Sequence, residues 1–240
     1  MSLRRFLIGA LPENGRSTLD PEVSKHAVKV LRLVAGDEVV LFDGRGTEWP
    51  GVIEKATKKG VVIAAGEARP TPKATGPKVI LGTAMPKGKR MSTLLSMATQ
   101  AGADLIVPVV FARSAVQGAS PTRLEHWRRT VAEAARQSGR AWMPALEEEV
   151  ALADFLARPR VEGERRFLPT TTGAPPSFAS LLARGPAAST VVILVGPEGG
   201  FTAAEEETAA AAGFEFCTLG PNILRVETAG VVAVGIVRGI

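Results

Sequence analysis

The chain has 240 residues, 45% of them hydrophobic and 22% charged, and its 29 basic and 24 acidic residues give a formal net charge of +5. This composition supports the core of one large or two modest domains and excludes disordered, collagen-like and coiled-coil chains. The single cysteine, Cys217, cannot form an internal disulfide, and no cluster of Cys or His has the spacing of a metal site. We expect no metal, and a soluble protein of the reducing cytoplasm, because no apolar run predicts a signal peptide or a membrane span.

The first 70 residues indicate a small, mostly β, barrel-like domain. Short extended runs between turn signals lie at 5–8, 38–42, 48–53 and 60–64. One helix is predicted over 21–33, with Asp20 as its N-cap. Three prolines and a glycine in the polar stretch 67–77 are typical of a semi-rigid linker. We place the first domain at 1–70, the linker at 71–77 and the second domain at 78–240.

The second domain is predicted to be an α/β domain with a parallel sheet. Five runs that are apolar almost throughout are predicted as strands, at 78–84, 105–111, 166–169, 191–195 and 216–219. Helical stretches alternate with them at 89–100, 121–138, 176–183, 203–212 and 229–237. Apolar strands joined by helices indicate a parallel sheet that is covered on both faces. Ligands of such sheets bind beyond the carboxyl ends of the strands.

Charge is distributed unevenly along this second part. Between residues 76 and 140, ten basic residues stand against three acidic ones, a local net charge of +7, whereas residues 141–240 carry −5. A positive potential of this size suits a polyanion such as nucleic acid, although a solvated helix face has the same pattern.

One candidate binding loop follows the predicted strand 191–195, with the residues Gly196, Pro197, Glu198, Gly199 and Gly200. Glycines let the backbone approach a ligand closely, and a proline makes one turn of the loop rigid. Thr202 and Glu205 then have the spacing of a capping box at a helix start. Because the loop matches neither a dinucleotide fingerprint nor a phosphate loop, we predict a different ligand.

A second constellation follows the last predicted strand, at residues 219–229. The chain turns at Gly220, and Thr228 is a candidate N-cap for the apolar helix that follows. Arg225 and Glu227 stand among apolar residues, where a charge is costly unless it is paired or used. Either these two side chains pair with each other or they serve a site.

Motifs throughout the chain resemble one known family. They are VGPEGGF at 195–201, LGPNILRVETA at 219–229, EAARQSGR at 133–140, the stretch 84–109, and the segments 26–33 and 36–44. In order and over essentially the whole chain, they are similar to the RsmE family, the small-subunit ribosomal RNA uridine-N3 methyltransferases of the SPOUT superfamily.

The resemblance implies an α/β fold in which a SPOUT-type parallel sheet with a C-terminal deep trefoil knot follows a small PUA-like β-barrel that binds RNA. It implies a cytoplasmic homodimer that uses S-adenosylmethionine to methylate N3 of a specific uridine in 16S ribosomal RNA of the small ribosomal subunit. Knot loops at 168–171, 194–200 and 219–225 would hold the methyl donor. The implied binding residues are Leu168, Thr170, Leu194, Gly196, Pro197, Glu198, Gly199, Gly200, Leu219, Gly220, Pro221, Leu224, Arg225, Thr228 and Ala229.

The chain departs from the family pattern at four positions. Gln100 and Arg136 stand where the family usually has Glu, Asn222 where it has Arg, and Val226 where it has Thr. Family roles that depend on those side chains are not carried over to this chain.

Methyl transfer to N3 needs positioning and the loss of a proton, but no metal and no covalent nucleophile. We expect Arg225 to stabilise charge on a uracil oxygen or to hold a phosphate, and Glu227 to orient it or to relay the proton. Glu198 is the competing candidate base, or an acceptor that braces its loop. Phosphate contacts are predicted at Arg4, Arg5, Lys25, Lys29 and Arg32 of the first domain and at Lys87, Lys89, Arg90, Arg113 and Arg140 of the second.

Two other functions fit much of the same sequence. A SPOUT enzyme that methylates a ribose 2′-hydroxyl would share the fold and the methyl donor. A non-catalytic ribosome-assembly protein would keep the basic surface and would not bind the donor.

Overall fold

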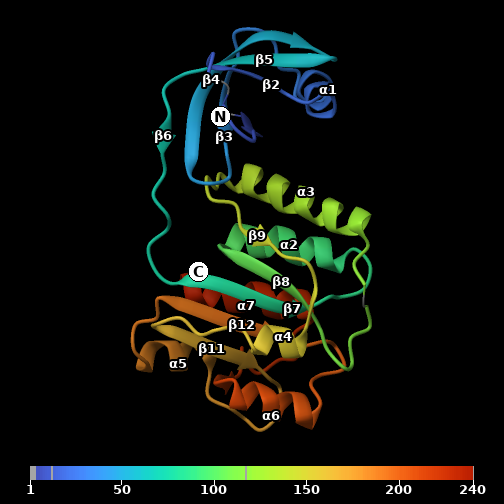
Figure 1. The fold of residues 1–240 in the computed structure, drawn as a ribbon, viewed down its shortest axis with the longest axis vertical. Helices are drawn as coiled ribbons and strands as arrows, with labels where there is room; N and C mark the ends of the chain where they lie inside the picture. Colours follow the sequence, from blue (N-terminus) through green and yellow to red (C-terminus); the bar gives the residue numbers. More distant parts are fainter. Residues whose placement is uncertain (1–3, 12, 117, 240) are drawn as a thin grey trace. The chain divides into compact units, whose positions relative to one another are not determined.

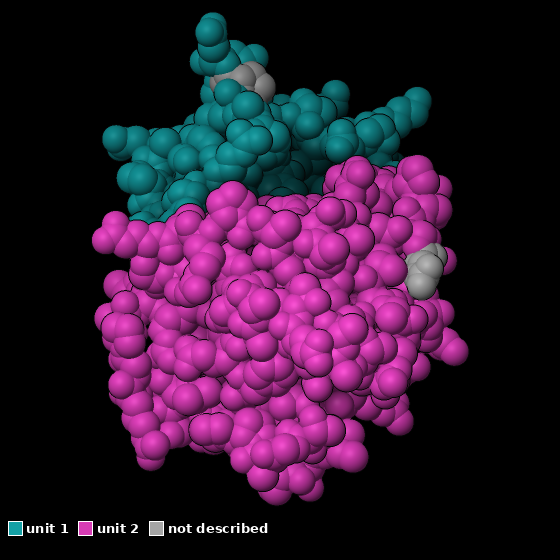
Figure 2. Space-filling view, turned by 60° about the horizontal axis from the view of Figure 1, so that its bottom comes forward, with its two compact units in different colours: residues 1–74, 135–143 teal, residues 75–134, 144–240 magenta. Residues whose placement is uncertain are grey.

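The computed structural model describes residues 4–11, 13–116 and 118–239. The chain forms two compact units, one of residues 1–74 and 135–143 and the other of residues 75–134 and 144–240 (Figure 2). No helix of the described residues is long and apolar enough to cross a membrane. The domain boundaries drawn from the sequence stay a prediction, and the inclusion of 135–143 in the first unit is a feature that the sequence pattern does not indicate.

The first unit is built on one sheet. Its strands are β1 (Arg4–Leu7), β2 (Arg16–Thr18), β3 (Glu38–Phe42), β4 (Thr47–Thr57), β5 (Gly60–Ala65) and β6 (Arg69–Pro70). They pair in the order β1-β3-β4-β5-β2, with β6 on β4; β1 runs parallel to β3 and the other pairs are antiparallel. Phe6, Leu41, Ile53 and Ile63 fill the core. The prediction of a mostly β domain is confirmed. Strands β2 and β6 were not predicted, because strands this short give no alternating pattern.

Helix α1 (Pro21–Lys29) is tied to the sheet by a serine. The Oγ of Ser24 donates to Leu19 O at 2.9 Å and accepts from Val61 N at 3.0 Å. Asp20 stands at the N-cap, but its side chain makes no capping hydrogen bond, so the capping role predicted for it is wrong.

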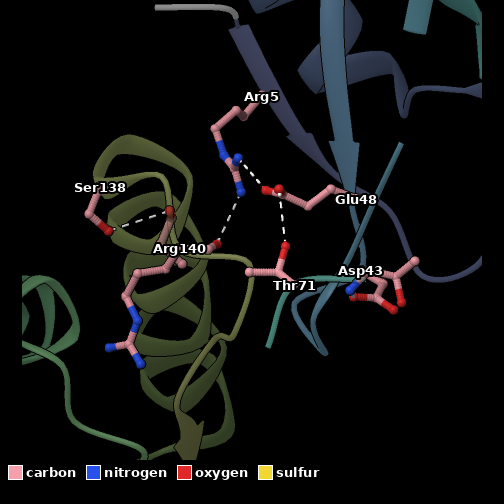
Figure 3. A network of polar contacts seen from close by, with 8 residues as sticks. Arg5, Asp43, Glu48, Thr71, Ser138 and Arg140 are labelled. Atoms are coloured by element: carbon pink, nitrogen blue, oxygen red, sulfur yellow. Dashed lines mark hydrogen bonds and ion pairs between the residues drawn. The ribbon is translucent and has the colours of Figure 1, made fainter. Parts of the chain in front are cut away.

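Residues 139–143 belong to the first unit partly through Arg5 (Figure 3). The Arg5 guanidinium pairs with Glu48 and donates to Arg140 O at 3.2 Å. Thr71 donates to the same carboxylate at 3.3 Å. Only 13% of the Arg5 side chain is exposed, so its guanidinium makes its contacts within the unit.

Trp142 is the second anchor of this segment. Its indole donates to Thr71 O at 2.7 Å, and Gly46 N donates to Ala141 O at 3.0 Å. Gly46 has a φ of 101°, and a Cβ at this position would lie 2.3 Å from the indole ring. Position 46 therefore requires glycine both for its left-handed backbone and for the space that the indole occupies.

The second unit contains a parallel sheet, which confirms the prediction. Its strands are β7 (Lys78–Ala84), β8 (Leu105–Val110), β9 (Ala145–Leu146), β10 (Val150–Ala151), β11 (Glu164–Pro169), β12 (Thr190–Val195) and β13 (Phe214–Cys217). The order is β10-β8-β7-β12-β11-β13, with β9 on β8, and the described pairs are all parallel.

Helices cover both faces of this sheet (Figure 1). They are α2 (Arg90–Ala101), α3 (Pro121–Ser138), α4 (Leu152–Leu156), α5 (Phe178–Arg184), α6 (Ala203–Ala211) and α7 (Val226–Arg238), of which α3 ends in the first unit. Two neighbouring residues of β7 contact helices on opposite faces of the sheet. A Cβ on Gly82 would lie 2.4 Å from the ring of Phe155 in α4, whereas Leu81 packs against Gly230 of α7.

Two predicted boundaries near the C-terminus are wrong. Helix α7 begins at Val226 rather than 229, so Thr228 lies in its first turn and cannot be its N-cap; Arg225 takes that position without a side-chain capping bond. The helix starts earlier than the apolar pattern suggests because Val226 is buried. Strand β13 ends at Cys217 rather than at 219, because the next residue forms a bridge to Ser177 instead of to β11.

Helix α1 also ends before the predicted position 33. The chain leaves the helix after Lys29 and turns at Arg32, which has a φ of 57°. The turn lets Leu33 enter the core with only 9% of its surface exposed.

A buried ion pair fastens β11 to its surroundings. Arg166 is 4% exposed and donates to Glu164 at 2.6 Å, to Leu156 O at 3.2 Å and to Arg158 O at 2.8 Å. Because a buried charge is tolerated only when its hydrogen bonds are made, these contacts explain how a charged pair is accommodated in the interior of the sheet.

We predict that Gly46→Ala lowers the free energy of unfolding by about 2–4 kcal/mol, because it adds backbone strain and a clash with Trp142. Gly76→Ala is the matched control, since Gly76 has a φ of 102° and nothing lies within 4 Å of its added Cβ. The control should lose only about 1 kcal/mol from strain. Urea unfolding measures both variants, and equal losses would contradict the role of the indole.

Cys217 gives a prediction about pH. Burial, with a smaller contribution from the charge of Glu215, raises the pKa of its thiol from 9.0 to about 12. The native thiol should therefore react with a disulfide reagent at pH 8 far more slowly than the unfolded one, since the thiolate is the reactive form. As the pH rises from 9 towards 12, the unfolded thiol ionises first, so the free energy of unfolding falls in this window.

Cys217→Ala is the control, because it removes this part of the pH dependence. A native thiol that reacts as fast as the unfolded thiol would contradict the burial of Cys217.

Candidate functional site

Three strand ends meet at one edge of the second sheet. Strands β12, β11 and β13 are parallel neighbours, so their carboxyl ends lie together. They lead into three loops, which we name the 170–177 loop, the glycine loop (residues 196–201) and the 218–225 loop. This is the edge at which parallel sheets bind ligands.

A cavity of about 510 Å³ opens at the ends of β11 and β13. It is lined by Thr170, Thr171, Ala174, Pro175, Thr218, Gly220, Pro221, Asn222 and Ile223. The predicted loops 168–171 and 219–225 contain Thr170, Thr171 and residues 220–223 of this lining, whereas Ala174, Pro175 and Thr218 lie outside them. Residues from the two loops become neighbours only through the pairing of β11 with β13, and no local pattern indicates that pairing.

The remaining binding residues implied by the sequence differ in their exposure. Leu168 and Leu194 are completely buried in β11 and β12, so they can shape the sheet edge but offer no side chain to a ligand. Leu219 and Leu224 are half-buried, Thr228 is exposed and Ala229 is buried in α7.

Close packing holds the glycine loop. A Cβ on Gly196 would lie 2.6 Å from the ring of Phe201, and this ring meets Phe111 edge to face with centroids 5.4 Å apart. After the loop, the predicted capping box is confirmed: Thr202 accepts from Glu205 N, and the Glu205 carboxylate accepts from Thr202 N. The loop is thus fixed at both of its ends.

Two basic side chains contact the exposed part of the glycine loop. Arg90 lies 3.4 Å from a carboxylate oxygen of Glu198, and about a third of each side chain is exposed, so solvent screens this pair. Arg113 donates to two backbone oxygens of the loop, Gly199 O and Phe201 O, each at 3.0 Å.

Arg225 and Glu227 do not pair with each other among the described residues. Arg225 is exposed, whereas one carboxylate oxygen of Glu227 is buried without a hydrogen-bond partner. Its position in the first turn of α7 favours a negative charge. An orphaned buried acceptor usually marks strain or a group that a ligand completes.

The candidate phosphate contacts fall into two groups. Arg4, Lys25, Lys29 and Arg32 are exposed in the first unit, and Lys87 and Lys89 are exposed in the second. Arg140 belongs to the first compact unit, whereas the predicted domain boundaries place it in the second domain. The chain beyond the end of α3 at Ser138 makes the contacts of Trp142 with the first unit. No group of three or more His, Cys, Asp or Glu among the described residues could hold a metal ion.

Known proteins match both parts of the chain. The family model described as RNA methyltransferase domain covers residues 74–238, and that described as RNA methyltransferase PUA domain covers residues 19–65. Ribosomal RNA small subunit methyltransferase E of Mycobacterium bovis is 31% identical over 238 residues, which is 97% of this chain and 90% of that protein.

Solved structures of methyltransferases share the fold. Ribosomal RNA small subunit methyltransferase E from Neisseria gonorrhoeae, bound to S-adenosyl methionine, has a TM-score of 0.88 at 27% identity over 99% of this chain and 98% of that one. A methyltransferase of Legionella pneumophila in complex with the bound cofactor SAM has a TM-score of 0.90 at 25% identity, over 100% and 98% of the two chains. By its matched domains and its relative aligned over nearly the whole length, the chain belongs to the RsmE family of RNA methyltransferases.

Proposed function

We propose that this protein uses S-adenosylmethionine to methylate N3 of a uridine in 16S ribosomal RNA. The observation that carries the proposal is the cavity at the carboxyl ends of β11 and β13, in a chain whose relatives are named ribosomal RNA small subunit methyltransferases. The solved neighbour from Neisseria gonorrhoeae is bound to S-adenosyl methionine, which supports the same donor here.

The residues of the cavity fit such a donor. A volume of about 510 Å³ lies within the range of small-molecule sites, which is roughly 300–1,000 Å³. Thr170, Thr171 and Thr218 offer hydroxyl groups, and Gly220, at a φ of 144°, has no atom within 4 Å of an added Cβ. When bound, S-adenosylmethionine supplies an electrophilic methyl group. We assign the donor to these residues together with the backbone of the glycine loop.

We also propose that the chain is threaded into a deep trefoil knot at this edge. Successive backbone groups of a strand point to opposite sides. Cys217 O accepts from Thr170 N on the β11 side, whereas Thr218 N donates to Pro176 O and Thr218 O accepts from Phe178 N. The 170–177 loop thus runs around the end of β13. Beyond it, the 218–225 loop leads to α7, which packs against β12 and β7, and this path supports a threaded chain.

Uridine N3 must lose its proton as the methyl group arrives. We assign to Arg225 the stabilisation of negative charge on a uracil oxygen, because this exposed side chain lies two residues beyond Ile223 of the cavity wall. Glu227, with its unpartnered oxygen, is suited to orient Arg225 or to relay the proton. The contact between Glu198 and Arg90 favours a bracing role for Glu198 over that of the base.

We assign RNA binding to the candidate residues that are exposed, because phosphate contacts position a substrate without specifying its sequence. They are Arg4, Lys25, Lys29 and Arg32 of the first unit and Lys87 and Lys89 of the second. Arg5 is left out because its guanidinium is already engaged by Glu48 and Arg140 O. The match to a PUA domain supports a role for the first unit.

A cytoplasmic homodimer is the assembly that we propose. Helix α7 keeps a row of half-buried apolar side chains that a second copy can cover, at Val231, Val232, Ile236 and Val237. Val234 of the same predicted face is already buried within one chain.

Arg225→Ala should lower kcat/KM for undermethylated 16S ribosomal RNA by about 10²–10³-fold, because one preorganised donor to the transition state is lost. The affinity for S-adenosylmethionine, measured by calorimetry, is determined in parallel. Arg184→Ala is the matched control, since it removes an exposed arginine at the end of α5. Near wild-type turnover of Arg225→Ala with unchanged donor affinity would contradict the role assigned to Arg225.

The proposed function is tested by incubating the protein with labelled S-adenosylmethionine and undermethylated ribosomal RNA, both free and in assembled small subunits. Mass spectrometry of the nucleosides should find 3-methyluridine. A ribose-methylated nucleoside would instead indicate the 2′-hydroxyl enzyme. No transfer together with no heat of donor binding would indicate a non-catalytic assembly protein.

A further inference from the structure

Three consecutive residues after β8 hold the glycine loop from outside. The Phe111 ring packs on Phe201, Ala112 N donates to the Glu205 carboxylate at 2.8 Å, and Arg113 donates to two loop carbonyls. The segment after β8 therefore restrains the loop by a ring contact and a charged side chain, and it contacts the start of α6 through the backbone bond to Glu205.

We propose that Arg113 is a positioning residue for methyl-donor binding, and that it sets the shape of the glycine loop instead of contacting RNA phosphate. The inference rests on the proposed function, because it takes the glycine loop as part of the donor site. A single nitrogen, Nη1, bridges Gly199 O and Phe201 O at 3.0 Å each. Two carbonyls two residues apart can share one donor only when the loop is folded back on itself.

The glycine at 199 has a physical explanation in this contact. A Cβ at that position would lie 3.1 Å from the Cβ of Arg113, closer than most such contacts. Gly200 turns the chain at a φ of 70°. Glycine thus gives the Arg113 side chain its approach to the loop, while Gly196 leaves room for Phe201.

These contacts lie at the surface, so their loss should change the order of the loop and leave the stability of the whole fold unchanged. Arg113 and Gly199 are both exposed, unlike the buried strands β8 and β12 that carry them. Loss of the Arg113 contacts should therefore free the loop without unfolding the sheet. A loop that must be ordered when the ligand binds gives weaker affinity than a preorganised one.

The test compares Arg113→Met with wild-type full-length protein. The Kd for S-adenosylmethionine, measured by calorimetry, should rise about tenfold to hundredfold, as expected for hydrogen bonds from a charged donor. Hydrogen exchange should quicken in the peptide that covers residues 196–202, while the urea midpoint stays close to that of wild type. Arg113→Lys, which keeps one charged donor, should recover part of the affinity.

Arg123→Met is the matched control, because Arg123 is an exposed arginine of the same region whose side chain donates to Gly118 O within its own segment. It should leave donor affinity and loop exchange unchanged. If Arg113→Met instead weakens RNA binding and leaves donor affinity and loop exchange at their wild-type values, the proposal is overturned.

Donor binding by the protein and loop positioning by Arg113 are tested separately. If wild-type protein binds no S-adenosylmethionine, the proposed function fails, whereas hydrogen exchange in residues 196–202 still decides whether Arg113 orders the loop. Unchanged exchange in Arg113→Met refutes the positioning role whatever the donor does.

Discussion

The parallel pairing of β11 with both β12 and β13 is the constraint on which the candidate site depends. Strand β11 lies between the other two, although β12 and β13 follow it in the chain. This order brings three carboxyl ends to one edge and makes the chain beyond β13 cross the end of β11 to reach α7. The cavity wall is therefore made by residues from 170–175 and 218–223. These two segments are held together by backbone hydrogen bonds from Thr170 N to Cys217 O and from Thr218 N to Pro176 O.

Charged side chains in this fold serve two different purposes. Arg166 and Arg5 are almost enclosed and make hydrogen bonds that fasten one segment to another. At the site, one oxygen of Glu227 is buried without a partner, and Arg225 is exposed beside it in sequence. Because an unpartnered buried acceptor is costly, we propose that a bound substrate or donor completes the hydrogen bonding of Glu227. The contrast supports a mechanism in which positioned polar groups act at the site.

The sequence predicts the elements whose pattern is long and uniform. The bounds of β7 and α3 agree with the prediction residue for residue, and the capping box of Thr202 and Glu205 is present. Predictions from local sequence patterns failed where a contact with a distant part of the chain determines the structure. Asp20 makes no capping bond, and Ser24 ties its helix to the sheet through Val61. The segment around Trp142 joins the first unit through Thr71, 71 residues away. Only part of the cavity wall was predictable, since its residues are distant in sequence; the motifs marked Gly220 and Pro221 but not Thr218 or Pro175.

The central claim is that the edge formed by β12, β11 and β13 binds the methyl donor. A crystal structure of the protein with S-adenosylmethionine tests it most directly. We expect to find the donor in the cavity between the 170–177 loop and the 218–225 loop, with the backbone of the glycine loop in contact and the methyl group facing Arg225. A donor bound elsewhere on the chain, with the cavity at Thr170 and Gly220 empty, would show that this sheet edge is not the donor site.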